Sequence, residues 1–202
     1  MSPRSPRPIL FTLALGVGAL ACKGDGFDPL DPDLIGDLGN DQGDAEGDDY
    51  TGLFATTLSP LDCDCPKLYP DDFPDLGAGL GLDPDDVIDP CAQLAIFYGV
   101  DTPAGGQVEI VQADGLLIWE SWLPPLSGPV DADGSFSVGG SEDFSESFVE
   151  ARLVSRVDAQ YSSPDAFLGV MQQRIIAKLL DRSVDCRSTH QIDGSRMDPS
   201  PP

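Results

Sequence analysis

Alternation of apolar and polar residues over positions 149–161 constrains the fold more than any other feature of this sequence. The apolar set is Val149, Ala151, Leu153, Val157, Ala159 and Tyr161, and the polar set is Glu150, Arg152, Arg156, Asp158 and Gln160. Successive side chains of a β-strand point to opposite faces, so a period of two predicts a strand with one apolar and one charged face. Such a strand needs partners, which indicates a mainly β fold.

Two hairpins are predicted before this strand. Their turns are Ala113-Asp114-Gly115, between residues 107–112 and 116–122, and Ala132-Asp133-Gly134, between residues 127–131 and 135–138. Glycine accepts the positive φ that tight hairpin turns require. The pattern predicts an antiparallel meander that forms a small barrel or sandwich.

Weaker signals complete the expected order of elements. A short apolar run at 93–98 suits a strand covered on both faces, and 188–197 is expected to form a last strand. Residues 58–90 are rich in Pro, Asp and Gly and are expected to form loops and turns.

The segment 163–182 fits two structures. Ser163, Pro164 and Asp165 suit the start of a helix, and the apolar residues from Phe167 to Leu180 fall on one helical face. The same residues also alternate, in which case residues 162–165 form a hairpin turn. The residues alone leave both structures open and slightly favour a helix near 165–181.

Four cysteines suggest two disulfides in an exported domain. Cys63 and Cys65 are too close in sequence to bridge each other comfortably, so one should pair with Cys91 and the other with Cys186. The sequence leaves open which pairs with which. A metal site is the alternative, but the C-x-C spacing differs from the paired C-x2-C spacing of zinc modules.

The segment 23–49 carries ten acidic residues, six Gly and two Pro. Strong self-repulsion and few apolar residues predict a disordered tether, and removing it should leave the melting temperature of the folded domain nearly unchanged. A calcium-dependent adhesion module is an alternative, although the spacing of calcium loops is missing. The whole chain has a net charge of -24, which argues against nucleic acid as a partner.

The N-terminus has the form of a secretory signal. Arg4 and Arg7 precede an apolar run at 9–20 that is shorter than a membrane-spanning helix. The run ends in Ala19-Leu20-Ala21-Cys22, which resembles the lipobox of bacterial lipoproteins, although Ala19 stands where that family usually has Leu. The resemblance implies cleavage before Cys22, acylation of this residue with chains such as palmitate, and delivery to the outer membrane or cell surface because Lys23 follows.

A second resemblance concerns residues 91–197. The stretches Val130-Asp131-Ala132-Asp133-Gly134-Ser135-Phe136 and Ile192-Asp193-Gly194-Ser195-Arg196 are similar to features of small β domains in uncharacterised bacterial lipoproteins with acidic leaders. This likeness implies a curved antiparallel sheet or small barrel and no known activity. Because of it we expect strands over 168–181 and keep the helix near 165–181 as the alternative. The expected divisions are a signal peptide at 1–21, a lipidated linker at 22–51, a disulfide-linked β domain at 52–198 and a disordered tail at 199–202.

Residue patterns typical of catalysis are missing. His190 is the only histidine and is expected to be half-exposed on a strand, while Asp131 and Asp133 fit a turn. Trp119 and Trp122 should face opposite sides of a strand, one of them in the core. We expect no enzyme, no cofactor and no metal, but a membrane-anchored binding or structural module whose protein or glycan partner is unknown, with a small-ligand carrier built on a hollow barrel as the alternative.

Overall fold

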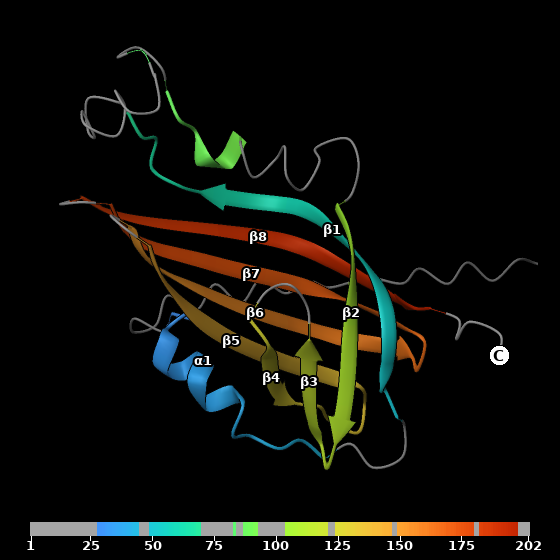
Figure 1. Ribbon diagram of the computed structural model, residues 1–202. Helices are drawn as coiled ribbons and strands as arrows, with labels where there is room; N and C mark the ends of the chain where they lie inside the picture. The colour runs from blue at the N-terminus through green and yellow to red at the C-terminus, as the bar shows by residue number, and fades with distance from the viewer. Residues whose placement is uncertain are drawn as a thin grey trace, which may run out of the picture.

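The computed structural model describes residues 28–44, 49–69, 83, 87–92, 104–120, 124–146, 149–179 and 182–197 (Figure 1). The expected signal peptide, Cys22, the expected strand at 93–98, Trp122 and the tail at 199–202 lie outside these residues.

Eight antiparallel strands form a closed barrel in which each strand pairs with the next and β1 pairs with β8 (Figure 1). They are β1 (Gly52–Asp64), β2 (Ala104–Ala113), β3 (Leu116–Glu120), β4 (Leu126–Pro129), β5 (Ser135–Glu146), β6 (Val149–Ser163), β7 (Ala166–Leu179) and β8 (Arg182–Arg196). This confirms the prediction of a mainly β meander that forms a small barrel.

The hairpins predicted from glycine are present. Asp114 and Gly115 both have positive φ, at 52° and 75°, and they join β2 to β3. Gly134, with a φ of 81°, lies in the turn before β5. Both turns therefore use the backbone conformation that glycine favours.

The alternative of a helix near 165–181 is wrong, because this segment is β7. It pairs with β6 from Ala166 to Leu179 and with β8 over the same length. A helix would leave the hydrogen-bonding edges of β6 and β8 unpaired, so the requirements of the neighbouring strands decide the structure here. The loop expected from residue 58 is also shorter than predicted, because β1 continues to Asp64 through a register shift after Pro60.

Aromatic side chains fill one end of the barrel. We call this cluster the aromatic floor; it consists of Tyr50, Phe54, Trp119, Phe136, Tyr161 and Phe167. The Phe167 ring lies 5.5 Å from the rings of both Trp119 and Tyr161, measured between centroids. Trp119 is thus the tryptophan that the sequence placed in the core.

Residues 28–44 do not form a free tether, which corrects the prediction for this part of the acidic segment. They include the helix α1 (Pro32–Leu38), which begins after the capping residue Asp31 and lies on the outside of β5 and β6 (Figure 1). Ile35 is 1% exposed and clusters with Leu30 and Val154. We call residues 28–44 the acidic strap. Leu30 and Ile35 are buried against the barrel and Leu38 packs beside them, which offsets the ordering cost that an isolated acidic chain could not meet.

Opposite charges hold the start of the acidic strap. The Asp28 carboxylate accepts hydrogen bonds from Arg174 at 2.9 Å and from Arg187 at 2.6 Å. These bonds, above all those from Arg187, lower the pKa of Asp28. Seven of the basic residues lie between 152 and 196, on β6, β7 and β8. The acidic strap therefore binds the side of the barrel where positive charge is concentrated.

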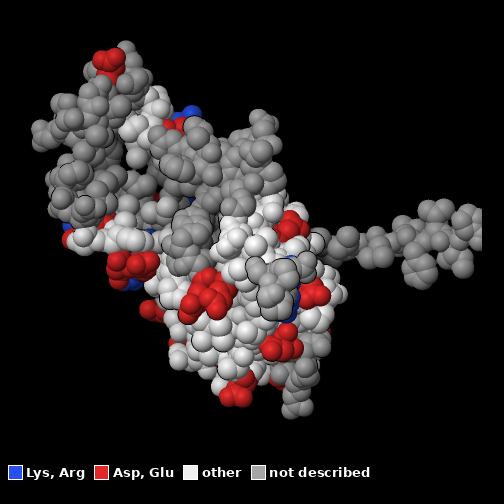
Figure 2. All heavy atoms as spheres, turned by 45° about the vertical axis from the view of Figure 1, so that its right-hand side comes forward, with Lys and Arg blue, Asp and Glu red and all other residues white. Residues whose placement is uncertain are grey.

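The chain closes the floor of the barrel beyond the acidic strap. Gly43 donates a backbone hydrogen bond to Gly115, and Asp44 accepts one from the Ala132 backbone. The ring of Tyr50 then stacks on Tyr161 with centroids 3.8 Å apart. Figure 2 shows acidic groups scattered over the described part of one face, which leaves the exterior strongly negative.

Candidate ligand site inside the barrel

Unequal strand lengths give the barrel one tall side. The strands β5 to β8 have 12, 15, 14 and 15 residues, whereas β3 and β4 have five and four. We call β5–β8 the long wall. Because β3 and β4 end early, the far half of the long wall extends beyond them (Figure 1).

The inner face of the long wall is built from aligned rungs. Pairing of β5 with β6, β6 with β7 and β7 with β8 sets one residue of each strand side by side. From the aromatic floor outward, the inward-facing rungs are Phe136–Ala159–Gly169–Ile192, Val138–Val157–Met171–His190, Gly140–Ser155–Gln173–Ser188, Glu142–Leu153–Ile175–Cys186 and Phe144–Ala151–Ala177–Val184. The chemistry of the wall therefore changes from aromatic to polar and then to aliphatic.

Four buried polar side chains of the described residues, other than tyrosine, lie on two adjacent rungs of this wall. Ser155, Gln173 and Ser188 occupy one rung, and His190 lies on the rung below. The Gln173 amide donates to the Ser155 hydroxyl at 3.5 Å. We call these four residues the polar layer. A group of hydrogen-bonding side chains inside an apolar barrel is costly to desolvate, so its concentration at one level suits a bound polar group.

The position of His190 corrects the expectation of a half-exposed residue. It is 2% exposed on the inner face of β8, and burial lowers its pKa, so the imidazole is neutral at pH 7. A neutral imidazole both donates and accepts a hydrogen bond. Ser188 and His190 are two residues apart on one face of β8, roughly 6–7 Å along the strand.

The rungs beyond the polar layer are apolar but only partly covered. Ile175 is 37% exposed and Phe144 is 47% exposed, although both side chains belong to the inward set. Leu153 and Ala151 lie beside them at intermediate exposure. We call these four residues the apolar ledge. Inward-facing apolar side chains that contact solvent are typical of a binding cleft, whereas those of a hydrophobic core are buried.

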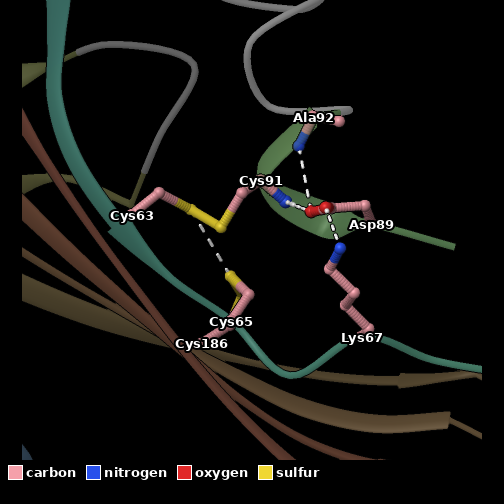
Figure 3. Close-up of a disulfide and its surroundings, with 7 residues drawn as sticks. All are labelled: Cys63, Cys65, Lys67, Asp89, Cys91, Ala92 and Cys186. Atoms are coloured by element: carbon pink, nitrogen blue, oxygen red, sulfur yellow. Dashed lines mark hydrogen bonds and ion pairs between the residues drawn. A yellow bond between two sulfur atoms is a disulfide. The ribbon is translucent and has the colours of Figure 1, made fainter.

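Disulfides close the rim beside the apolar ledge. The structure joins Cys65 to Cys186 and Cys63 to Cys91, with Cα atoms 4.3 Å and 5.8 Å apart (Figure 3). Cys186 shares a rung with Ile175, so the first bridge ties the end of β1 to the long wall. The second fixes residues 87–92, where the Asp89 carboxylate accepts from the backbone of Cys91 and Ala92 and pairs with Lys67 at 3.5 Å (Figure 3).

The same sulfur atoms are those that the metal alternative would use. The sulfur atoms of Cys63, Cys65 and Cys91 lie within 4.8 Å of one another. A disulfide leaves its sulfur atoms without the thiolate charge that binds zinc, so the pairing in this structure favours covalent closure of the rim.

The two aspartates considered as an acid–base pair belong to a turn. Asp133 accepts hydrogen bonds from the backbone and the hydroxyl of Ser135, and these bonds lower its pKa. Asp131 accepts from the same hydroxyl at 3.5 Å. Both carboxylates are exposed and lie in the turn before β5, whereas the polar layer is level with Gly140 in the middle of that strand. They stabilise the hairpin and do not contribute to the candidate site.

A hollow of about 470 Å³ lies at the tip of the long wall. It is lined by Asp143, Phe144, Ser145, Glu150, Ala151, Arg152, Ile176, Ala177, Lys178 and Ser183. Most of these residues belong to the outward-facing set by strand alternation, and Arg152 binds Asp143 through two hydrogen bonds. The hollow therefore has mixed charge and contains no residue of the polar layer, but it shares Phe144 and Ala151 with the apolar ledge.

Burial of the single histidine predicts a pH dependence of stability. The pKa of His190 in the folded chain is below its value of about 6.5 in the unfolded chain, so unfolding takes up a proton below pH 6.5. The free energy of unfolding should fall by at most about 1.4 kcal/mol per pH unit as the pH drops from 6.5 towards 5. Chemical denaturation at several pH values measures this slope.

His190→Gln is the control for this prediction. The acids with lowered pKa, such as Asp28 and Asp185, remain ionised through this pH range, so the variant should show a much flatter slope even if it is less stable overall. Equal slopes for the two proteins would contradict the assignment.

Comparisons with known proteins do not assign this chain to a family. No protein-family model matches the chain, and no significant match was found among curated proteins. Among solved structures, an S-type phycobiliprotein lyase from Guillardia theta is similar with 13% sequence identity over 74% of this chain and 89% of that chain. The TM-score is 0.23, which is too low for an argument about fold or function. Within the described residues, no helix has the length and apolar character needed to cross a membrane.

Proposed function

We propose that this protein is an exported lipoprotein whose barrel binds a small, mainly apolar ligand at the open end of the long wall. The ligand places a polar group at the polar layer and its apolar part along the apolar ledge. Lipidation at Cys22 holds this binding module at a membrane surface, in the outer membrane or on the cell surface. The proposal extends the expectation of a binding module to a particular face of the barrel.

The layered inner face of the long wall supports this proposal. The aromatic floor fills the lower end, so a ligand has access from above it only. The polar layer offers the Gln173 amide, the His190 imidazole and serine hydroxyl groups at one depth. Ile175 and Phe144, above it, expose apolar surface inward. Sites for small molecules combine mainly apolar walls with a few polar groups that fix orientation.

The calcium alternative has less support. Its carboxylates would come from the acidic segment, and Asp28 in that segment is held by two guanidinium groups. A calcium ion would have to displace these arginines to use the Asp28 carboxylate.

Substitution of one inward residue tests the ligand site. Ile175→Glu places a charge on the apolar ledge, and we expect it to weaken binding of the neutral apolar dye Nile red at least tenfold, because a buried carboxylate near the dye would lose its hydration. Ile176→Glu is the matched control, since Ile176 lies next in sequence but faces outward, and it should change the affinity less than twofold. Equal affinities in both variants would place the dye elsewhere and contradict the proposed site.

The lipid attachment has its own test. Cys22→Ser removes the acyl acceptor, so the exported variant should leave the membrane fraction and appear in the soluble fraction. One acyl chain binds membranes only marginally, and durable anchoring needs two or more, so the change in distribution should be nearly complete. A variant that is exported and still sediments with membranes would refute lipidation at Cys22.

A further inference from the structure

The acidic strap limits how far the barrel can lie from a lipid on Cys22. Asp28 is fixed to β7 and β8 through Arg174 and Arg187, with N–O distances of 2.9 Å and 2.6 Å. The side chains of Asp28 and Arg174 are 25% and 18% exposed, so this contact is partly shielded from water. Asp28 follows Cys22 by six positions, and six residues of fully extended chain span about 20 Å. The sequence predicted a long tether, but only a short linker, residues 23–27, separates Cys22 from the fixed Asp28.

The short linker joins the barrel at Asp28, on the side formed by β7 and β8. Arg174 and Arg187 face outward on neighbouring strands at the same level. Any lipid on Cys22 must therefore lie within about 20 Å of Asp28. The strands β3 and β4 lie across the barrel from β7 and β8, so their outer face must be farther from the lipid.

The outer face of β7 and β8 also carries exposed aliphatic and basic side chains that suit a membrane surface. The exposed aliphatic side chains Leu168 and Val170 face outward at one end of β7, and Lys178 faces outward at the other. Arg187 is 42% exposed between them. Two acidic residues of β8, Asp185 and Asp193, also face outward here, and Asp185 pairs with Arg174 at 2.7 Å, whereas the whole chain has a charge of -24. Anionic headgroups repel acidic surface and attract basic residues, each attraction being worth about 1 kcal/mol near a bilayer.

We infer that the outer face of β7 and β8 lies against the bilayer surface, oriented by the contact of Asp28 with Arg174 and Arg187. This inference rests on the proposed lipidation of Cys22. The acidic strap then orients the barrel on the membrane, because it fixes the short linker from Cys22 to one face of the barrel. The opposite wall, with β3 and β4, then faces away from the membrane.

Lysine labelling tests this orientation. The lipidated chain carrying Glu120→Lys, whose new lysine lies on the exposed outer face of β3, would be reconstituted into vesicles of phosphatidylcholine and phosphatidylglycerol. A membrane-impermeant amine reagent is then applied, and modification is measured by mass spectrometry against the unlipidated chain with Cys22→Ser. Modification of Lys178 should fall at least fivefold on the vesicles, while modification of the lysine introduced by Glu120→Lys should change less than twofold.

The contact with Asp28 is tested in the same assay. Asp28→Asn should restore modification of Lys178 to within about twofold of the unlipidated chain, without loss of the protein from the vesicles. Asp33→Asn is the matched control, because Asp33 is an exposed residue of α1, and it should preserve the protection of Lys178. Equal protection of Lys178 and of the lysine introduced by Glu120→Lys, or protection of the latter alone, would overturn the inference. Protein that does not float with the vesicles at all would instead overturn the lipidation, and the orientation with it.

Discussion

A chain that begins at Gly52 is expected to unfold at a temperature roughly 5–15 °C below that of a chain beginning at Lys23. The shorter chain lacks Leu30, Ile35 and Tyr50, which are 3%, 1% and 4% exposed in the structure. Burial of each such side chain contributes about 1.5–3 kcal/mol, and the cost of ordering the acidic strap offsets part of this sum. The loss of Tyr50 also uncovers the ring of Tyr161 in the aromatic floor.

Thermal unfolding followed by circular dichroism measures this difference. Ile35→Ser in the longer chain should reproduce a large part of it, because Ile35 is buried against Val154 and lies close to Gly139. Asp37→Asn is the matched control on the exposed side of α1 and should shift the melting temperature by less than about 2 °C. Equal melting temperatures for the two chains would mean that the acidic strap does not stabilise the barrel.

Gly194→Ala is expected to destabilise the barrel by about 3 kcal/mol. Gly194 faces inward on β8 directly beneath the ring of Phe167, and an added Cβ atom would overlap this ring. The ring cannot move aside easily, because the rings of Phe54, Trp119, Phe136 and Tyr161 surround it. Overpacking of a dense core costs about 1–3 kcal/mol and occasionally more.

A double-mutant cycle identifies the cause. In a Phe167→Leu background the smaller side chain leaves room, so Gly194→Ala should cost at least about 1 kcal/mol less than in the native chain. Gly36→Ala is the control, since a methyl group added at this position of α1 would meet no neighbouring side chain or strand within 4 Å, and it should be neutral or slightly stabilising. An undiminished cost in the Phe167→Leu background would refute the overlap as the cause.

Local patterns predicted the regular parts of the barrel. Alternation along β6 and the glycines of two hairpins depend on neighbouring residues only, so the sequence contains enough to place them. β7 remained ambiguous because Ile175, Ile176, Leu179 and Leu180 fit both a helical face and an alternating strand. The unpaired edges of β6 and β8 resolve this ambiguity, and they become visible only when the three strands are assembled.

The acidic strap was mistaken for a tether because its stabilising partners are distant in sequence. Asp28 pairs with Arg174 and Arg187 across about 150 residues, and Ile35 packs on Val154. The spacing of Ile35 and Leu38, shortly after Leu30, was an available signal, since residues three or four apart share one side of a helix. The high acidic content masked this signal.

The candidate site was not predictable from the residues that form it. Alternation along 149–161 puts Ser155 on the apolar face, but nothing in the sequence near His190, Gln173 and Ser188 indicates that they lie beside it. Their juxtaposition depends on the registers of β6, β7 and β8, and each of those registers is fixed by an entire hairpin. The open end depends in addition on the short lengths of β3 and β4.

Native mass spectrometry tests the central claim most directly. The Cys22→Ser chain, purified without denaturant, should show a mass above that of the same chain after denaturation, and the difference should match a compound recovered by extraction into organic solvent. The chain with Ile175→Glu in addition should show no such difference. Native and denatured masses that agree for the parent chain, together with no compound in the extract, would contradict the account of the barrel as a carrier of a small apolar ligand.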